Sequence, residues 1–300
     1  MTGVTASAMS APSTQPDHVT PPLLGENDPA PFTVLNENTD VPCIIISDHA
    51  GNNVPQKLGN LGLTDDDLGH HGAMDVGVRY ITTRLSEILG ATAIIGNFSR
   101  LVVDLNRRLD HPTAFVTNME GTPVPGNDHL TDMDKELRAK EIYEPYHDEV
   151  ERLIRAFLDK GTVPVLMSLH SFTPVFYKQR RPWEIGFLWV QDKRMPEIMI
   201  DYFEGKGYCV GDNEPYDARI LRGTTLNRHA DELRLPNALA EFRNDEIDTD
   251  EKGEQWAVMM AEALQNVMAD DGIHTLYDGP MLEQPDRAQE LNYFNELIEN

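Results

Sequence analysis

Short apolar runs alternate with longer amphipathic segments along most of the chain. Val41–Ser47, Ala91–Ile95 and Val163–Met167 are continuous apolar runs of the length expected of buried strands. Asp75–Leu89 and Lys135–Leu158 carry apolar residues at helical spacing, and each ends near a glycine. This alternation predicts an α/β fold with a mostly parallel or mixed central sheet flanked by helices.

The second half of the chain continues the pattern less regularly. Ile185–Val190, Tyr208–Val210 and Leu235–Ala240 are further strand candidates, and Gln255–Met268 has the pattern of a final helix. Residues 110–133 contain several Pro, Gly and Asp residues and predict a long surface loop, the kind of segment that often borders a functional site.

The composition divides the chain into three parts. Residues 1–31 are rich in Ser, Thr, Pro and Ala without an apolar period, which predicts a disordered tail. Residues 32–275 carry all the predicted strands and helices and form one α/β domain. Residues 276–300 are expected to be a peripheral acidic extension.

The charge balance limits the class of partner. The chain has 25 basic and 50 acidic residues, and its formal net charge of −25 disfavours nucleic acid and anionic membranes. An acidic small molecule would need a local cluster of arginines. No apolar run approaches the roughly 20 residues of a membrane helix, and the N-terminus has no secretory signal pattern. We expect a soluble, cytoplasmic protein in which Cys43 and Cys209 are reduced core residues.

Four apolar runs are followed by chemically active side chains. These are His49, Arg100, His170 and Glu241. Because ligands of open α/β sheets bind at the carboxyl ends of the strands, we expect these side chains to meet in one site.

Two histidines at separate strand ends are typical of a transition-metal site, and zinc is the default ion for imidazole and oxygen ligands. His49 and His170 are the candidate pair. The third ligand is open between Asp75, a carboxylate at a helix start, and Asn52, whose amide is a poor zinc ligand. His71, four residues before Asp75, could share a helix face with it as a supporting or simple surface residue.

Nearby polar groups have structural alternatives. Asp48 could orient His49, and His229 is expected on the solvated face of a helix. An arginine in an apolar stretch requires an anionic partner, so Arg107 either binds a substrate carboxylate or pairs with Asp104.

Glu241 ends an apolar run, where an ionised carboxylate is costly unless it has a partner or a catalytic role. Arg243, two residues later on the same face of the strand, is the candidate partner. Otherwise Glu241 is placed to act as the general base for a metal-activated water.

Several motifs in fixed order give the chain a specific resemblance. It is similar to the N-formylglutamate amidohydrolase family, within the wider superfamily of zinc carboxypeptidases and aspartoacylases, over roughly residues 32–270. The segments that carry the resemblance are Ser47–Asn52, His71–Gly77, Ser99–Arg107, Arg181–Gly186, Asn213–Tyr216 and Glu241–Asp245.

The resemblance implies a zinc-carboxypeptidase-like fold and a zinc-dependent amidohydrolase that cleaves an acidic N-acyl amino acid, with N-formyl-L-glutamate as the best single substrate. It implies that His49 and His170 bind zinc and that Glu241 activates water. Arg100 would polarise the scissile carbonyl.

The resemblance also implies that Asn106, Arg107, Arg181 and Arg243 bind the substrate. At one position this chain departs from the wider superfamily. The wider superfamily has glutamate three residues after the first histidine, where this chain has Asn52, and we therefore choose Asp75 as the third ligand. The competing hypothesis is a non-catalytic protein whose arginines bind a carboxylate ligand without metal.

Overall fold

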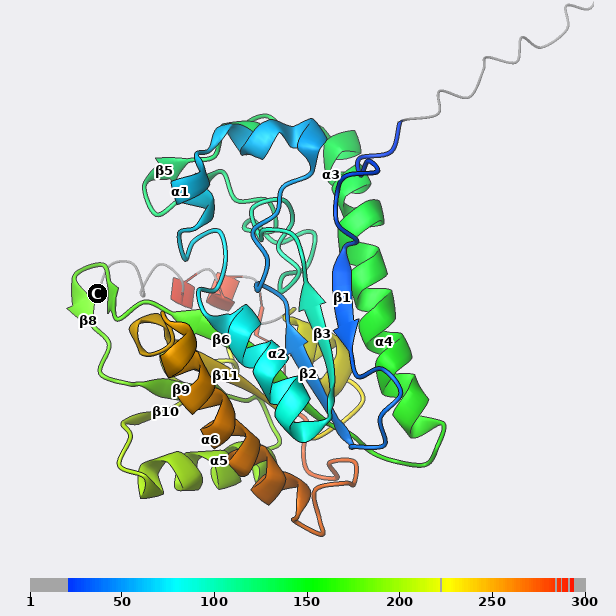
Figure 1. The fold of residues 1–300 in the computed structure, drawn as a ribbon, viewed down its shortest axis with the longest axis vertical. Helices are drawn as coiled ribbons and strands as arrows, with labels where there is room; N and C mark the ends of the chain where they lie inside the picture. The colour runs from blue at the N-terminus through cyan, green and yellow to red at the C-terminus, as the bar shows by residue number, and fades with distance from the viewer. Residues whose placement is uncertain (1–20, 222, 284, 287, 291, 294–300) are drawn as a thin grey trace, which may run out of the picture.

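The computed structural model describes residues 21–221, 223–283, 285–286, 288–290 and 292–293 (Figure 1). Within these residues, a seven-stranded sheet has the order β1-β3-β2-β6-β11-β9-β10. Strands β3, β2, β6 and β11 are parallel to one another, whereas β1 pairs antiparallel with β3 and β9 antiparallel with β11. The predicted α/β fold with a mostly parallel, mixed sheet is confirmed.

The sheet strands are β1 (Phe32–Leu35), β2 (Cys43–Ser47), β3 (Thr92–Gly96), β6 (Val165–Phe172), β9 (Ile185–Leu188), β10 (Val210–Asp212) and β11 (Asn237–Arg243). The helices are α1 (Asp65–Leu68), α2 (Val78–Leu89), α3 (Asp132–Arg138), α4 (Glu144–Leu158), α5 (Arg194–Gly205) and α6 (Asp250–Met268). Two small ribbons, β4 (Asn118–Met119) with β5 (Thr122–Pro123) and β7 (Val175–Phe176) with β8 (Gln179–Arg180), lie outside the sheet.

The helices cover both faces of the sheet, as Figure 1 shows. On one face, α2, α5 and α6 bury residues such as Ile81, Phe203 and Trp256 against alternate strand positions. On the other face, α4 contributes Tyr146 and Ile154 to a second core cluster. The four parallel strands are buried on both faces, which explains why their sequences are continuous apolar runs.

The helix predicted from Lys135 begins earlier and contains an irregular turn. Thr131 caps α3 through a reciprocal hydrogen-bonded box with Asp134. A π-helical turn over residues 139–143 then joins α3 to α4, directly before Pro145, which has no N–H for a regular helical bond. Helix α5 was not predicted.

Two expectations about the ends and the thiols need correction. Leu23, placed in the predicted tail, is buried in the core, and its backbone N–H donates to Glu141 at 2.7 Å. The structure therefore packs residues before position 32 onto the domain, while residues 1–20 lie outside the described part. Cys43 is buried as expected, but Cys209 is exposed.

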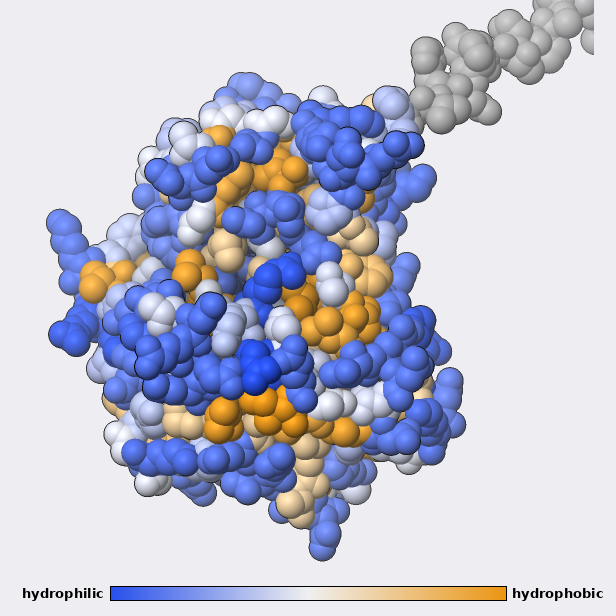
Figure 2. Space-filling view, viewed as in Figure 1, coloured by the Kyte–Doolittle hydropathy of each residue, from blue (hydrophilic) through white to orange (hydrophobic). Residues whose placement is uncertain are grey.

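The surface agrees with the acidic composition. Figure 2 shows a mostly hydrophilic face over α2 and α6, with scattered apolar patches. Within the described residues, no helix combines the length and the apolar composition needed to cross a bilayer.

Candidate metal and catalytic site

The predicted side chains lie near the carboxyl ends of the parallel strands. His49 follows β2, His170 lies in β6, and Glu241 lies in β11, directly paired in register with His170. Parallel register partners point to the same face, so Glu241 and His170 lie side by side. Both residues are inside their strands because β6 and β11 extend beyond the apolar runs that predicted them.

A close backbone approach brings the segments after β2 and β3 together. A Cβ atom at Gly51 would lie 2.3 Å from the carbonyl of Asn97, so only glycine fits there. The approach places His49, from the first segment, against Asp104, from the second, with Nε2 and Oδ1 2.7 Å apart.

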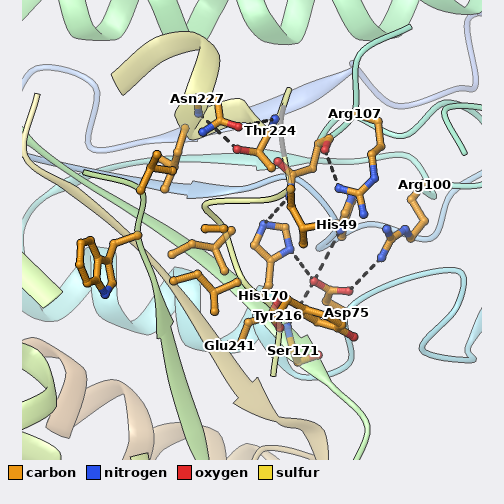
Figure 3. A pocket seen from close by; sticks show the side chains of 18 of the residues that line it. His49, Asp75, Arg100, Arg107, His170, Ser171, Tyr216, Thr224, Asn227 and Glu241 are labelled. Carbon is orange, nitrogen blue, oxygen red and sulfur yellow. Dashed lines mark hydrogen bonds and ion pairs between the residues drawn. The ribbon is translucent and has the colours of Figure 1, made fainter. Parts of the chain in front are cut away.

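His49, Asp75 and His170 form a buried group whose ligand atoms lie within 4.8 Å of one another (Figure 3). Oδ2 of Asp75 lies 2.8 Å from Nδ1 of His170 and 3.7 Å from Nδ1 of His49. Nδ1 of His49 is buried without a hydrogen-bond partner among the described residues. Two imidazole nitrogens and one carboxylate oxygen are a donor set that fits a divalent transition metal. Asn52 is exposed, and it is not in this group.

Each histidine is held from its far side by a carboxylate. Asp104 binds Nε2 of His49 at 2.7 Å, and Asp48 lies 3.3 Å from Nε2 of His170. Such carboxylate contacts fix the ring and turn the other nitrogen towards a metal. Asp48 therefore supports His170, and the expectation that it orients His49 was wrong, because the turn after β2 moves His49 to Asp104.

The electrostatics favour a cation at this point. Burial alone would raise the pKa of Asp75, but the hydrogen bond with His170 and the proximity of His49 hold that pKa below its ordinary value. Burial lowers the pKa of His170, and the carboxylates of Asp48 and Asp75 more than offset this and raise it to about 10. The carboxylates thus attract positive charge to the space between the two rings.

Glu241 is a buried carboxylate with a raised pKa. Its Oε2 atom is buried and has no hydrogen-bond partner among the described residues. Burial raises its pKa to about 7, and the nearby Asp75 carboxylate adds to the effect, while His170 and Arg181 oppose it. The alternative ion pair with Arg243 is not formed, because the guanidinium of Arg243 binds Asp245 at 2.7 Å and Glu246 at 2.5 Å.

The stretch after β3 brings two arginines to the site. Arg100 binds Oδ2 of Asp104 at 2.8 Å and approaches Oδ1 of Asp75 at 3.8 Å. Arg107 lines the same cavity and donates from Nη1 to the carbonyl of Asn106. Asn106 accepts from the backbone N–H of Thr225, and its Nδ2 lies 3.4 Å from Nε2 of His170. Figure 3 shows both arginines on the same side of the histidine pair.

Three predicted residues lie outside this arrangement. Arg181 is packed among the rings of Phe176 and Tyr216, at 4.4 and 5.0 Å from their centroids, and neither it nor Arg243 lines the cavity. His71 binds Glu120 at 2.9 Å instead of accompanying Asp75 on a helix, because α2 begins only at Val78.

The site opens into a cavity of about 350 Å³. One part is polar and contains His49, Asp75 and His170 together with Glu241 and the two arginines. The rest is lined mainly by residues with no recognisable sequence signal, from the end of β9, the segment before β11 and β11 itself: Leu188, Trp189, Val190, Ala218, Leu221, Thr224, Leu226, Asn227, Asp231, Asn237 and Leu239. Asp104 did have a signal, a carboxylate within the apolar Val-Val-Asp-Leu stretch, but it was interpreted only as a partner for Arg107.

The chain is similar to known proteins in sequence and in fold. The family model of N-formylglutamate amidohydrolase matches residues 41–247. A crystal structure of a gene product from Agrobacterium tumefaciens is 32% identical, with a TM-score of 0.79, over 82% of this chain and 98% of that chain. The N-formylglutamate amidohydrolase from Ralstonia eutropha JMP134 shares the fold at 20% identity, with a TM-score of 0.63, over 80% of this chain and 97% of that chain. No curated protein matches. The family match covers more than half of the sequence and its residues include the whole buried site, and the chain therefore belongs to the N-formylglutamate amidohydrolase family.

Proposed function

We propose that this protein is a metal-dependent amidohydrolase that cleaves the amide bond of an N-acyl amino acid. The observation that carries the proposal is the buried Oε2 of Glu241, which has no hydrogen-bond partner in the described part of the chain and lies beside a buried His-Asp-His group. A buried carboxylate without a partner reduces the stability of the fold. Such groups are typical of catalytic sites, where the reaction requires them.

His49, Asp75 and His170 would hold one divalent ion, with zinc as the expected metal. When bound, the ion supplies Lewis-acid chemistry that acidifies water and polarises a carbonyl oxygen. Asp104 and Asp48 contact the Nε2 atoms of His49 and His170, which leaves the two Nδ1 atoms as the nitrogens that would hold the ion.

Glu241 takes the proton from the attacking water and returns it to the leaving amine. Its pKa of about 7 suits both steps, because the carboxylate accepts a proton and gives it up near neutral pH. Arg100, held by Asp104, is placed to stabilise negative charge on the carbonyl oxygen as the tetrahedral species forms.

Arg107 would bind the carboxylate of the substrate, since a guanidinium offers paired donors to it. Asn106 positions this region by joining Thr225 to the His170 ring. An arginine cluster is what a protein with a net charge of −25 needs to retain an acidic substrate. N-formyl-L-glutamate, the substrate in the family name, is the reference compound for assays.

The test is hydrolysis of N-formyl-L-glutamate and related N-acyl amino acids together with metal analysis. We expect about one zinc-like ion per chain, loss of hydrolysis on chelation, and recovery when zinc is restored. Full hydrolysis by metal-free protein would contradict the metal assignment. Tight binding of N-acyl amino acids without metal or turnover would favour the competing function, a carboxylate-binding protein.

A further inference from the structure

The cavity continues past the catalytic groups into an apolar chamber. We define this apolar chamber by Leu188, Trp189, Val190, Leu226 and Leu239, all of which line the cavity. Leu188 and Leu239 are register partners on β9 and β11, so they form one continuous wall. The side chains of Leu188, Leu226 and Leu239 are only 4–7% exposed, which makes the wall a packed part of the core rather than a mobile surface.

The chamber is directly joined to the base. On β11, alternate side chains face the cavity, and Asn237, Leu239 and Glu241 line it in turn. At the far end, the carboxylate of Asp231 accepts amide N–H groups from Asn227 at 2.7 Å and Asn237 at 3.1 Å. This end is therefore a hydrogen-bonded polar cap, whose carboxylate is bound by two amides.

The arginines lie on the other side of the catalytic groups. Among the described residues that line the cavity, Arg100 and Arg107 are its only guanidinium groups. Both also line an outer hollow of about 260 Å³, together with Tyr216 and Glu120, and no residue of the apolar chamber lines that hollow. A substrate carboxylate thus has its partners on the outer side, and the chamber has none for it.

The position of the chamber indicates which half of the substrate binds in it. The scissile carbonyl carbon carries the amino acid on one side and the acyl group on the other. If the amino acid carboxylate binds Arg107 and the carbonyl oxygen faces Arg100, the acyl group points into the apolar chamber. Formyl, a single carbon with one hydrogen, would leave this apolar space unfilled.

We propose that the apolar chamber is the acyl-binding subsite and that the preferred substrates carry an unbranched apolar acyl chain of several carbons instead of formyl. This inference rests on the proposed amidohydrolase function. Burial of each methylene is worth ~0.8 kcal/mol, or about fourfold in kcat/KM. The value of kcat/KM therefore rises with the length of the acyl group until the chamber is filled.

The first experiment compares N-formyl-, N-acetyl-, N-butanoyl- and N-hexanoyl-L-glutamate with the zinc-loaded protein. We expect kcat/KM to rise about fourfold per added carbon. The inference is overturned if kcat/KM is highest for the formyl substrate and falls as the acyl chain becomes longer. A preference for N-formyl-L-norleucine over N-hexanoyl-L-glutamate also overturns it, because the chamber would then hold the amino acid side chain.

Calorimetric binding to the Glu241→Gln variant separates this inference from the proposed function. Affinity that increases along the series, with no hydrolysis of any member by the wild type, supports the chamber and contradicts the amidohydrolase assignment. Affinity that does not change along the series, with hydrolysis present, contradicts the chamber alone.

A substitution that narrows the chamber supplies the structural test. Leu226→Phe is expected to lower the ratio of kcat/KM for hexanoyl over formyl substrate at least tenfold, and Leu188→Phe provides the same test from the wall formed by β9 and β11. Leu233→Phe is the matched control, because Leu233 is 45% exposed and does not line the cavity. An unchanged ratio in both chamber variants overturns the inference.

Discussion

Oδ2 of Asp48 lies 3.3 Å from Nε2 of His170, across the parallel strands β2 and β6. The other oxygen of Asp48 accepts a hydrogen bond from the Thr225 hydroxyl at 2.8 Å. Asp48 thus lies between the second histidine and Thr225, whose neighbours Thr224 and Leu226 line the cavity.

This contact predicts a role in metal affinity. Asp48→Asn keeps the shape of the side chain but removes the negative charge that turns Nδ1 of His170 towards the ion. We expect metal affinity to fall about 10- to 100-fold, the range found for such supporting contacts. Competition with a chelator of known affinity measures it. Asp128→Asn, at an exposed carboxylate, is the control, and equal affinity in both variants would rule out the supporting role.

The third ligand is tested by a pair of substitutions. Asp75→Ala removes the carboxylate oxygen shared by both histidines, and we expect it to abolish stoichiometric zinc binding. Asn52→Ala changes an exposed side chain and should retain zinc. Metal analysis after gel filtration measures both. Retention by the first variant and loss by the second would show that the ligand assignment is wrong.

The role of Glu241 predicts a variant that folds and binds metal but does not turn over. Glu241→Gln keeps the side-chain volume and removes the base, so kcat should fall by about 10²–10⁴ with zinc content unchanged. Because burial raises the pKa of Glu241, a neutral amide should leave the melting temperature unchanged or higher. A lower melting temperature with a small rate change would instead indicate a structural ion pair.

Carboxylate recognition is tested at Arg107. Lysine retains the charge but cannot copy the paired donors of a guanidinium. Arg107→Lys is therefore expected to lose about 2 kcal/mol of transition-state binding, the scale of a charged hydrogen bond, with metal content unchanged. The measurement is kcat/KM for N-formyl-L-glutamate. Arg180→Lys, at an exposed residue of β8, is the control.

The sequence was informative about the strands that are buried on both faces, because their continuous apolar runs are easy to recognise. Apolar runs buried on both faces located β2, β3, β6 and β11, and the polar groups that interrupt them, His49, His170 and Glu241, were therefore recognisable. The supporting contacts were harder to predict, because the turn after β2 decides whether Asp48 or Asp104 meets His49. No local pattern could show that.

The cavity walls could not be predicted for a similar reason. Leu188 and Leu239 resemble ordinary core residues, and only the pairing of β9 with β11 places them beside Glu241. His229 was expected on a solvated helix face, but it is 4% exposed and packs against His147. A histidine at helical spacing does not reveal whether its face meets solvent or another buried histidine.

That buried histidine pair predicts a pH dependence of stability. Nε2 of His147 lies 3.0 Å from the carbonyl oxygen of Leu105 and must donate to it, so Nδ1 of His147 accepts from Nε2 of His229 at 2.9 Å. Burial, followed by the proximity of His229 and Arg228, lowers the pKa of His147 to about 3. Burial and Arg228 likewise lower the pKa of His229 to about 4, against weaker opposing effects of Asp48 and Glu151.

Both histidines are thus neutral in the folded protein over a range in which the unfolded chain binds protons. Their contribution to stability is fully present above the unfolded pKa of 6.5, and it is lost as pH falls towards the folded values of about 3 and 4. Between pH 7 and pH 5 the loss is about 2 kcal/mol per histidine. The glutamine of His229→Gln retains an N–H donor for His147 but does not titrate. On lowering the pH, the free energy of unfolding of this variant should therefore fall by about 2 kcal/mol less than that of the wild type. Urea unfolding of metal-free wild type and variant at pH 7 and pH 5 measures the difference, with His129→Gln, at a side chain that is 92% exposed, as the control. An identical pH dependence in wild type and His229→Gln would mean that the pair is not held neutral.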